Sequence, residues 1–287
     1  MPLLFAVLGL LFSLTARAET YGFSIPSYAS VRGGFTDIES YSAGINAGLT
    51  LANNKILGVS LETVAMPNTV EEGTLSLNSA SVSLSSDPLS DWSFQGSVDG
   101  WTSEDAVSAY GARGAATWTG ARWMWTVEYG LQLITFNELP VLLWSDKKST
   151  VSDNSILLAG DVQLSRNFSM RASYRIHNYN TPMEDYAQGL RTRFIAAEVL
   201  NMAGTLTKED TDLGLTYFRR KWRFGLDLSS NVSSLDQLRT NGLGLRVGYR
   251  LRKKWSFEMQ GARYDSENSS ASSSALHSFN STATYSW

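Results

Sequence analysis

The chain contains no cysteine and has two histidines among its 287 residues. The absence of cysteine excludes a disulfide framework, a thiolate nucleophile and any metal site built on sulfur. Charge is also sparse, because 18% of the residues are charged and the formal net charge is -3. Neither the basic stripe of a nucleic-acid-binding protein nor the charge-dominated composition of a disordered chain is present. Phosphate-binding loops and dinucleotide fingerprints are absent too, so we expect no cofactor and no metal.

The N-terminus holds the longest apolar run, in MPLLFAVLGLLFSLTARAET, which ends at the small-x-small sequence Ala16-Arg17-Ala18. This pattern predicts a secretory signal peptide, residues 1–18, and an exported mature chain, residues 19–287. The run is shorter than the ~20 residues that a membrane-spanning helix needs, which disfavours the alternative of an N-terminal anchor. No later stretch approaches such a helix in length or apolarity. The exported chain is therefore either soluble in the periplasm or spans a membrane as a closed β-barrel.

Apolar and polar residues alternate along most of the mature chain. Because successive side chains of a strand point to opposite faces, this period predicts strands with one apolar and one polar face. The runs are about ten residues long, which is the length a tilted strand needs to cross a bilayer. The longest apolar stripe consists of Trp123, Trp125, Val127, Tyr129, Leu131 and Leu133.

The connections between these runs alternate in length, as they do in outer-membrane barrels. Short links are ANN (52–54), TG (119–120), SRN (165–167), RRK (219–221) and RKK (252–254), and longer ones lie near 66–73, 137–154, 233–239 and 266–275. We therefore predict an all-β fold, a transmembrane antiparallel β-barrel of about fourteen strands, with twelve as the alternative. The expected strands are 24–35, 40–51, 55–65, 74–85, 91–101, 106–118, 122–136, 156–165, 168–178, 209–218, 222–232, 240–251, 255–266 and 274–287.

The strand count depends on the stretch 179–208. Its sequence Thr181-Pro182-Met183-Glu184 matches a helix start, so we expect an external loop with a short helix. The alternative makes TRFIAAEVL a strand, which would change the parity of the count.

The strand 74–85 has a fault in its alternation. Leu75 and Leu77 disagree in parity with Val82 and Leu84, so we expect a β-bulge there.

Six tryptophans lie beside predicted short turns or at the end of the chain. Indole combines an apolar ring with one N–H donor, which favours the membrane–water interface. The alternative is that aromatic residues begin strands in any β-protein. The six predicted interface residues are Trp92, Trp118, Trp123, Trp222, Trp255 and Trp287.

The chain ends in HSFNSTATYSW, with Phe279, Ala283, Tyr285 and Trp287 on one parity and Ser281 as a polar exception. In this feature and in its architecture the mature chain resembles the outer-membrane β-barrel proteins of Gram-negative bacteria, in particular the smaller porin-like channels. No single family is identified. The resemblance implies location in the outer membrane, contact with its lipid, and recognition of the last strand by the barrel-assembly machinery. Nucleic acid is not expected as a partner.

The polar faces of the predicted strands carry charges of both signs. Rows of arginine at 171/175 and 246/250 would favour passage of anions or acidic sugars through a water-filled lumen. The alternative is that arginines and carboxylates cross-pair and fill the interior. The predicted pore-lining residues are Glu62, Arg113, Glu128, Asp161, Arg171, Arg175, Asp227, Arg246, Arg250 and Glu258, with Asp99 and Arg223 on the same face. We expect Trp144, Lys147 and Lys148 at a solvated loop tip, with an inward constriction as the alternative.

An enzyme is not expected, although some phospholipases, lipid A deacylases and omptin proteases share the barrel scaffold. His277 and the adjacent Ser278 face opposite sides of one strand, and His177 shares its face with no serine except Ser173. Nothing in the sequence marks out an omptin-like set of aspartates and histidine. The sequence therefore favours a passive, porin-like diffusion channel for small hydrophilic solutes, with an anionic preference open. The alternatives are a structural or adhesive barrel without transport and an outer-membrane lipid hydrolase.

Overall fold

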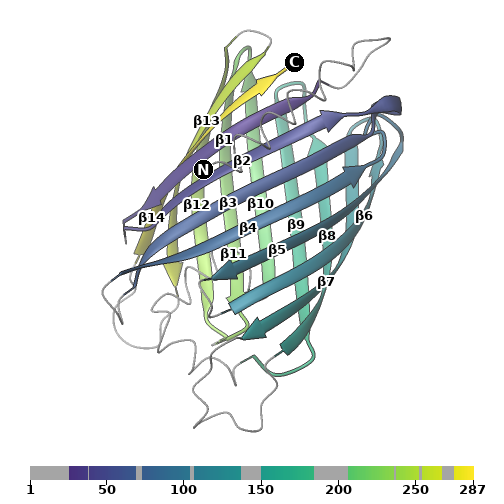
Figure 1. Ribbon diagram of the computed structural model, residues 1–287. Helices are drawn as coiled ribbons and strands as arrows, with labels where there is room; N and C mark the ends of the chain where they lie inside the picture. Colours follow the sequence, from purple (N-terminus) through teal and green to yellow (C-terminus); the bar gives the residue numbers. More distant parts are fainter. Residues whose placement is uncertain are drawn as a thin grey trace, which may run out of the picture.

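The computed structural model describes residues 26–37, 39–68, 73–103, 107–136, 150–183, 206–235, 237–251, 254–266 and 275–287. Within these ranges the chain forms fourteen antiparallel strands that close into one barrel (Figure 1). The strands are β1 (Tyr28–Thr36), β2 (Tyr41–Thr50), β3 (Ile56–Asn68), β4 (Gly73–Ser85), β5 (Trp92–Ser103), β6 (Val107–Thr119), β7 (Trp123–Phe136), β8 (Thr150–Gln163), β9 (Phe168–Tyr179), β10 (Thr207–Arg219), β11 (Trp222–Ser233), β12 (Arg239–Leu251), β13 (Trp255–Ser266) and β14 (Ala275–Ser286). Among the described residues, no helix has the length and apolarity to cross a membrane.

The barrel closes where β1 pairs with β14, and the two strands lie side by side in Figure 1. Their register runs from Tyr28 opposite Ser286 to Thr36 opposite Ser278. The backbone N–H of Trp287 extends this seam by donating to the carbonyl of Ser27 at 2.9 Å. The ring of strands therefore has no open edge, which is the condition for placing a sheet in hydrocarbon.

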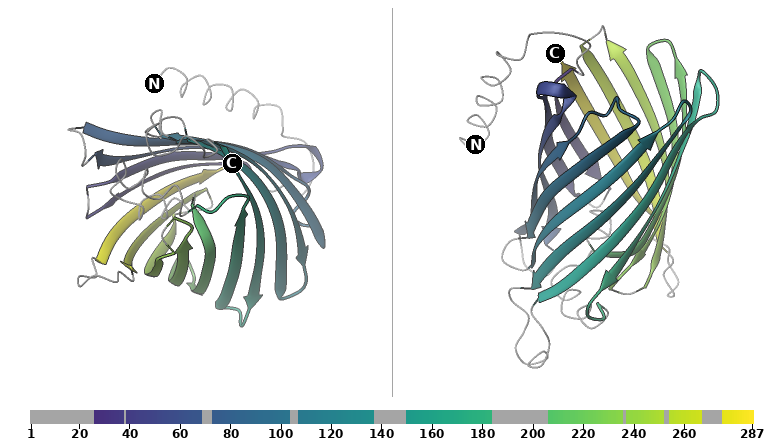
Figure 2. Two further views of the ribbon diagram at one scale, coloured as in Figure 1. Left: turned by 90° about the horizontal axis from the view of Figure 1, so that it is seen from below. Right: turned by 90° about the vertical axis from the view of Figure 1, so that its right-hand side faces the viewer.

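The barrel has a short-turn end, where β1 begins and β14 finishes, and an opposite loop end. The turns at the short-turn end include a 3-10 turn over Ala52–Asn54 and the two residues between β10 and β11. Asn53, Asn54 and Arg220 there adopt left-handed backbone angles, with φ of 59°, 55° and 55°. Asparagine accepts this conformation more readily than most residues. The strands slant steeply around the wall between the two ends, as the right-hand view of Figure 2 shows.

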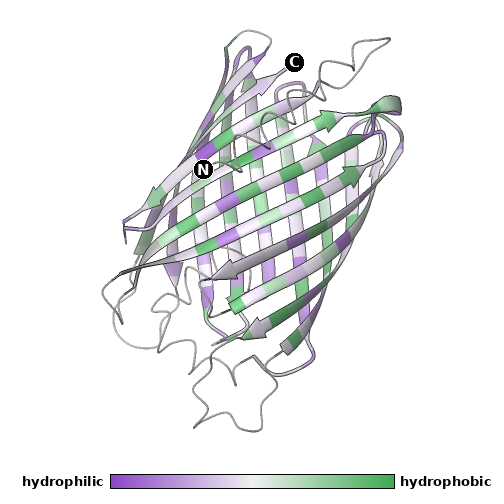
Figure 3. Cartoon of the chain, viewed as in Figure 1, coloured by the Kyte–Doolittle hydropathy of each residue, from purple (hydrophilic) through white to green (hydrophobic). Residues whose placement is uncertain are grey.

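The two faces of the wall meet different environments. On β7 the outward side chains from Trp123 to Leu133 are each at least half exposed, at 50–55%. Figure 3 shows the same alternation of hydrophobic and hydrophilic residues along the strands. A contiguous apolar surface of this extent is a liability in water but suits contact with lipid.

The interior at the loop end is packed with apolar side chains, here named the loop-end cluster. Strands β4 to β8 and the chain beside β9, β10 and β11 supply it. Its buried members are Leu77, Trp101, Val107, Ala109, Ile134, Phe136, Val151, Met183, Leu206 and Leu235. The main apolar cluster of the described residues is thus inside one end of the barrel, while most of the side chains that line the remaining interior are polar or charged.

The structure confirms fourteen strands and corrects two details of the sequence analysis. The bulge expected in β4 is wrong, because β4 keeps a continuous register with β3 and β5. Leu77 faces inward and is buried in the loop-end cluster. The inner face of β4 is therefore apolar at this position, although inward and outward residues alternate without a break along the strand. An irregularity lies instead in β10, between Thr207 and Glu209.

Strand β8 begins at Thr150, earlier than the expected 156. Its first residues invert the usual pattern, since the inward Val151 is apolar and the outward Ser152 and Asn154 are polar. The sequence pattern therefore resembled a loop. The expected helix or strand within 184–205, and Trp144, Lys147 and Lys148, lie outside the described residues.

Candidate functional site: the polar lumen

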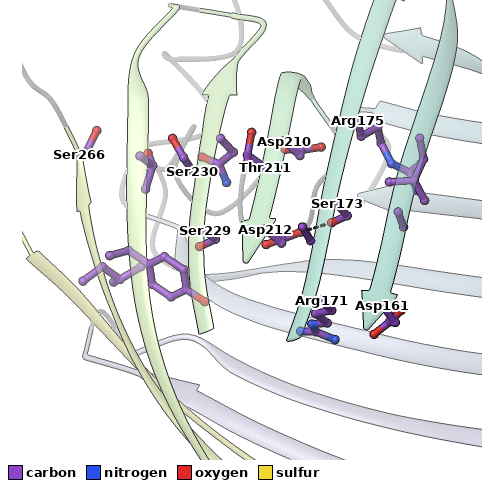
Figure 4. A pocket seen from close by; sticks show the side chains of 17 residues that line it. Asp161, Arg171, Ser173, Arg175, Asp210, Thr211, Asp212, Ser229, Ser230 and Ser266 are labelled. Atoms are coloured by element: carbon purple, nitrogen blue, oxygen red, sulfur yellow. Dashed lines mark hydrogen bonds between the residues drawn. The ribbon is translucent and has the colours of Figure 1, made fainter. Parts of the chain in front are cut away.

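The lumen contains two adjoining cavities of about 570 and 1000 Å³. The smaller one lies against β8 to β14 and is shown in Figure 4. The larger one extends along β1 to β10 and also touches β13 and β14. Arg175, Asp210 and Tyr264 line both cavities, so the two meet along these side chains.

Three of the arginines cross over a glycine to reach a carboxylate two strands away. Arg32 on β1 pairs with Glu62 on β3, and Gly44 of β2 lies between them in the register. A Cβ at Gly44 would approach Arg32 Nε to 2.9 Å, so any larger residue would displace the guanidinium. Glycine in a strand interior often marks such a close approach.

The same arrangement recurs on the other side of the barrel. Gly214 lies between Arg171 and Asp227, whose Nη2 and Oδ1 atoms are 3.3 Å apart. The third example is Arg223 and Glu258, which are hydrogen-bonded across a glycine of β12. The glycines of the inner face therefore have a role that the sequence pattern did not reveal, because it depends on the register of three strands.

Further ion pairs join charged residues of the inner face. Asp227 also accepts a hydrogen bond from Arg246 at 3.0 Å, so it holds two guanidinium groups. Arg175 donates to Glu128 at 2.8 Å across β8. The cross-pairing alternative thus holds for three of the four arginines expected to attract anions.

The smaller cavity has carboxylates without a basic partner. Asp212 accepts a hydrogen bond from the hydroxyl of Ser173 at 3.3 Å, the contact drawn as a dashed line in Figure 4. Asp161 lies opposite Arg171 in the register but forms no ion pair with a described residue. Asp161 and Asp212 thus place two carboxylates without an ion pair among the described residues of this part of the lumen.

The ten predicted pore-lining residues fall into two groups in the structure. Nine of them line a cavity or belong to an ion pair of the inner face: Glu62, Arg113, Glu128, Asp161, Arg171, Arg175, Asp227, Arg246 and Glu258. Arg113 is paired with Asp99 at 3.4 Å. Arg250, near the short-turn end, is exposed and forms no ion pair within the described part of the chain. Whether these residues line a path for solutes stays a prediction.

The six predicted interface tryptophans lie at strand ends of the short-turn end. Five of them have side chains exposed by 37–57%, namely Trp92, Trp118, Trp123, Trp222 and Trp255. Trp222 packs on Tyr249 with ring centroids 4.6 Å apart, and Trp255 packs on Tyr285 at 4.9 Å. The ring of Trp287 stacks on Tyr285 as well, with ring centroids 5.9 Å apart. Their contact with a membrane interface remains a prediction.

The two histidines have carboxylate partners that the sequence analysis did not identify. His177 Nδ1 lies 2.7 Å from Asp153 Oδ2, inside the barrel. His277 points outward, and its Nδ1 lies 2.9 Å from Asp37 Oδ2 in the β1–β2 turn. The Asp153 contact was missed because the residue belongs to the segment interpreted as loop. Parity alone, continued back from Asp161, would have placed it inside.

Comparisons with known proteins support the fold. No protein-family model matches the chain, and no curated protein matches it by sequence. Among solved structures it is similar to the toluene transporter TodX of Pseudomonas putida, with a TM-score of 0.55, 9% identity, and coverage of 91% of this chain and 88% of that one. The KdgM porin is similar with a TM-score of 0.47 at 9% identity, covering 91% of this chain and 99% of that one. An anion-selective porin from Comamonas acidovorans has a TM-score of 0.49 at 8% identity, with 91% and 98% coverage.

At such identities the likeness shows the fold. The closed fourteen-stranded barrel and the likeness to TodX together confirm the predicted resemblance: the chain has the architecture of outer-membrane β-barrel proteins.

Proposed function

We propose that the protein is a passive diffusion channel for small hydrophilic solutes in the outer membrane. The observation that carries the proposal is the pair of polar cavities, about 570 and 1000 Å³, inside a closed barrel with an apolar outer face. A barrel wall of this kind places water-soluble molecules within reach of lumen side chains while the outside contacts lipid. TodX, which shares the fold, is a transporter, in agreement with this proposal.

Charge in the lumen argues for weak selectivity. Fixed charges in a pore favour ions of opposite sign mainly where no nearby group neutralises them. Arg171, Arg175 and Arg246 are all paired with carboxylates. We therefore expect no strong anion preference. The ion-paired residues of the inner face instead set the cross-section that a solute can use.

The loop-end cluster favours a second candidate, a structural barrel that does not conduct. Its buried side chains fill the interior at the loop end, where Met183, Leu206 and Leu235 enter from the chain beside three strands. A fixed plug there would block diffusion. Recording in planar bilayers decides between the two functions.

The experiment uses the mature chain, folded in detergent and checked by its slower mobility on unheated gels. The channel proposal expects discrete conductance steps and swelling of liposomes in neutral sugars. Folded protein that gives neither would refute the channel and leave the structural barrel. The variant Ile134→Ala is an internal comparison, because it removes side-chain volume from the loop-end cluster. It should raise the conductance only if this cluster restricts the diffusion of ions through the barrel.

The proposal includes how the chain reaches the membrane. Residues 1–18 would direct export and be removed. The outward face of β14, with Phe279, Ala283 and Tyr285, would be recognised by the barrel-assembly machinery and then contact lipid. Its alternating apolar residues and the terminal ring of Trp287 support this part of the proposal.

A further inference from the structure

Three titratable side chains from adjacent strands meet inside the barrel near the loop end. Asp153 is on β8, His177 on β9 and Asp210 on β10. Imidazole Nδ1 lies 2.7 Å from Asp153 Oδ2, so the ring is held by one good hydrogen bond. The other nitrogen, Nε2, is 3.7 Å from Asp210 Oδ2, which is too far for a hydrogen bond.

Two atoms of this group are buried without a partner. The side chains of His177 and Asp153 are 7% and 2% exposed. Among the described residues, neither Nε2 of His177 nor Oδ1 of Asp153 has a hydrogen-bond partner. Both residues line the larger cavity, as does Asp210. Buried polar atoms are normally hydrogen-bonded, so we expect a bound group in the cavity to form hydrogen bonds with these two atoms.

The chemistry of these atoms defines what they would bind. In the neutral tautomer that donates Nδ1–H to Asp153, Nε2 is an acceptor. Asp153 Oδ1 is an acceptor as well, as is Asp210, whose Oδ2 also accepts a hydrogen bond from the hydroxyl of Thr207 at 2.9 Å. The nearest guanidinium does not compensate them, because Arg175 is engaged by Glu128 at 2.8 Å. With a neutral ring the site therefore carries excess negative charge, and no described side chain donates to Asp153 Oδ1 or to His177 Nε2. A cation with several N–H groups satisfies both conditions.

A metal ion is a poorer match. No group of three or more histidine, aspartate or glutamate side chains in the described ranges has the geometry to hold one. The apolar Leu77 and Trp101 line the same cavity and give a short hydrocarbon chain a surface to contact.

We propose that Asp153, His177 and Asp210 form a binding site for the primary ammonium group of a short alkylamine at the loop end of the larger cavity. The three N–H groups donate to Asp153 Oδ1, to His177 Nε2 and to Asp210. The site requires the folded barrel but not conduction, so it goes beyond the proposed channel function.

Binding at this site competes with a proton for the same atom. A proton on Nε2 of His177 removes an acceptor and adds a positive charge, so the ammonium group binds the neutral ring. The groups facing the ring are Asp153, Asp210, the stacked ring of Tyr179 at 6.1 Å, and the Arg175–Glu128 pair. Alkylammonium must therefore shift the titration of His177 to lower pH.

The chain suits a direct test because it has two histidines. The folded protein in micelles is labelled with ¹⁵N-histidine, and His277→Gln removes the second signal. His277 lies outside the barrel, with its side chain 59% exposed. Propylammonium chloride should shift the Nε2 resonance of His177 in a saturable way. At a concentration ten times the dissociation constant, the titration midpoint should fall by about one pH unit. Tetramethylammonium, which has the same charge and no N–H, should have no such effect.

Matched variants locate the site. Asp153→Asn should weaken propylammonium binding at least tenfold, whereas Asp161→Asn, a carboxylate on the same strand at the smaller cavity, should not. If Asp153→Asn does not fold, Asp210→Asn, at a more exposed position, gives the same comparison. An unmoved His177 signal, an equal response to tetramethylammonium, or equal weakening by Asp161→Asn would overturn the site. A protein that binds propylammonium but passes no current would refute the channel alone.

Discussion

Replacing Asp227 by asparagine removes one charge while preserving shape, and it leaves two guanidinium groups without their carboxylate. Oδ1 of Asp227 lies 3.3 Å from Arg171 and 3.0 Å from Arg246. The side chains of Asp227 and Arg246 are mostly buried, at 16% and 14% exposure, whereas Arg171 is 52% exposed. The two pairs therefore differ in how strongly water screens them.

The burial sets the expected loss. An exposed ion pair such as the one with Arg171 contributes at most about 1 kcal/mol. A charge-assisted hydrogen bond like that of Arg246 contributes about 1.5–3 kcal/mol, and losing one partner of a fully buried pair costs up to about 5 kcal/mol. Because Arg171 is half exposed and the pair with Arg246 is not fully buried, we expect Asp227→Asn to lower the free energy of unfolding by about 2–4 kcal/mol.

The measurement is urea unfolding in lipid vesicles, followed by tryptophan fluorescence. Asp161→Asn is the control, since it changes the lumen charge equally at a carboxylate without an ion pair, and it should cost less than about 1 kcal/mol. Both variants should move the reversal potential towards anions by similar amounts. Equal stability losses would refute the assignment of Asp227 as the residue that holds two arginines.

Three further outcomes are expected. Gly214→Ala places a methyl 2.9 Å from both members of the Arg171–Asp227 pair, so it should lower the free energy of unfolding by about 1–3 kcal/mol in the same assay. Gly114→Ala is the control, because the added methyl meets no atom within 4 Å, and it should leave the free energy of unfolding unchanged or raise it by up to about 1 kcal/mol. Burial raises the pKa of Asp37, but hydrogen bonds from His277 outweigh this effect and hold the pKa below the ordinary 3.8. The hydrogen bonds between Asp37 and His277 should therefore be complete above pH 3.8 and be lost as the pH falls through the lowered pKa. An amide signal of His277 that stays constant on acidification would contradict this. Trp287→Ala should reduce the heat-modifiable barrel in outer membranes without changing the fold of refolded protein, and unchanged membrane levels would argue against recognition of the last residue.

The strands were predictable because their two faces meet two solvents. Alternation placed β13 at 255–266, as the structure has it, since Trp255, Phe257 and Met259 face outward and Glu258 faces the lumen. The prediction failed where the inner face becomes apolar. At Leu77 and at Val151 the interior is packed rather than wet, so the polarity rule that identified the other strands misled the interpretation.

The polar site was predictable as a set of inward charges but not as a set of contacts. Parity assigns Arg171 and Asp227 to the lumen, yet their pairing depends on Gly214 between them and on the register of three strands. The Asp153–His177–Asp210 group likewise depends on the register of three strands, β8, β9 and β10. Such contacts join residues distant in the chain, and local pattern does not encode them.

The seam between β1 and β14 has a kinetic consequence. It joins residues 28 and 286, so it encloses almost the whole polypeptide in one loop. Until β1 and β14 pair, the sheet is open and has two unpaired edge strands, each able to pair with another chain. Contacts this distant in sequence slow the search for the native arrangement. Maturation should therefore finish in one late, concerted step, and chains stalled before it would be the species most prone to aggregate.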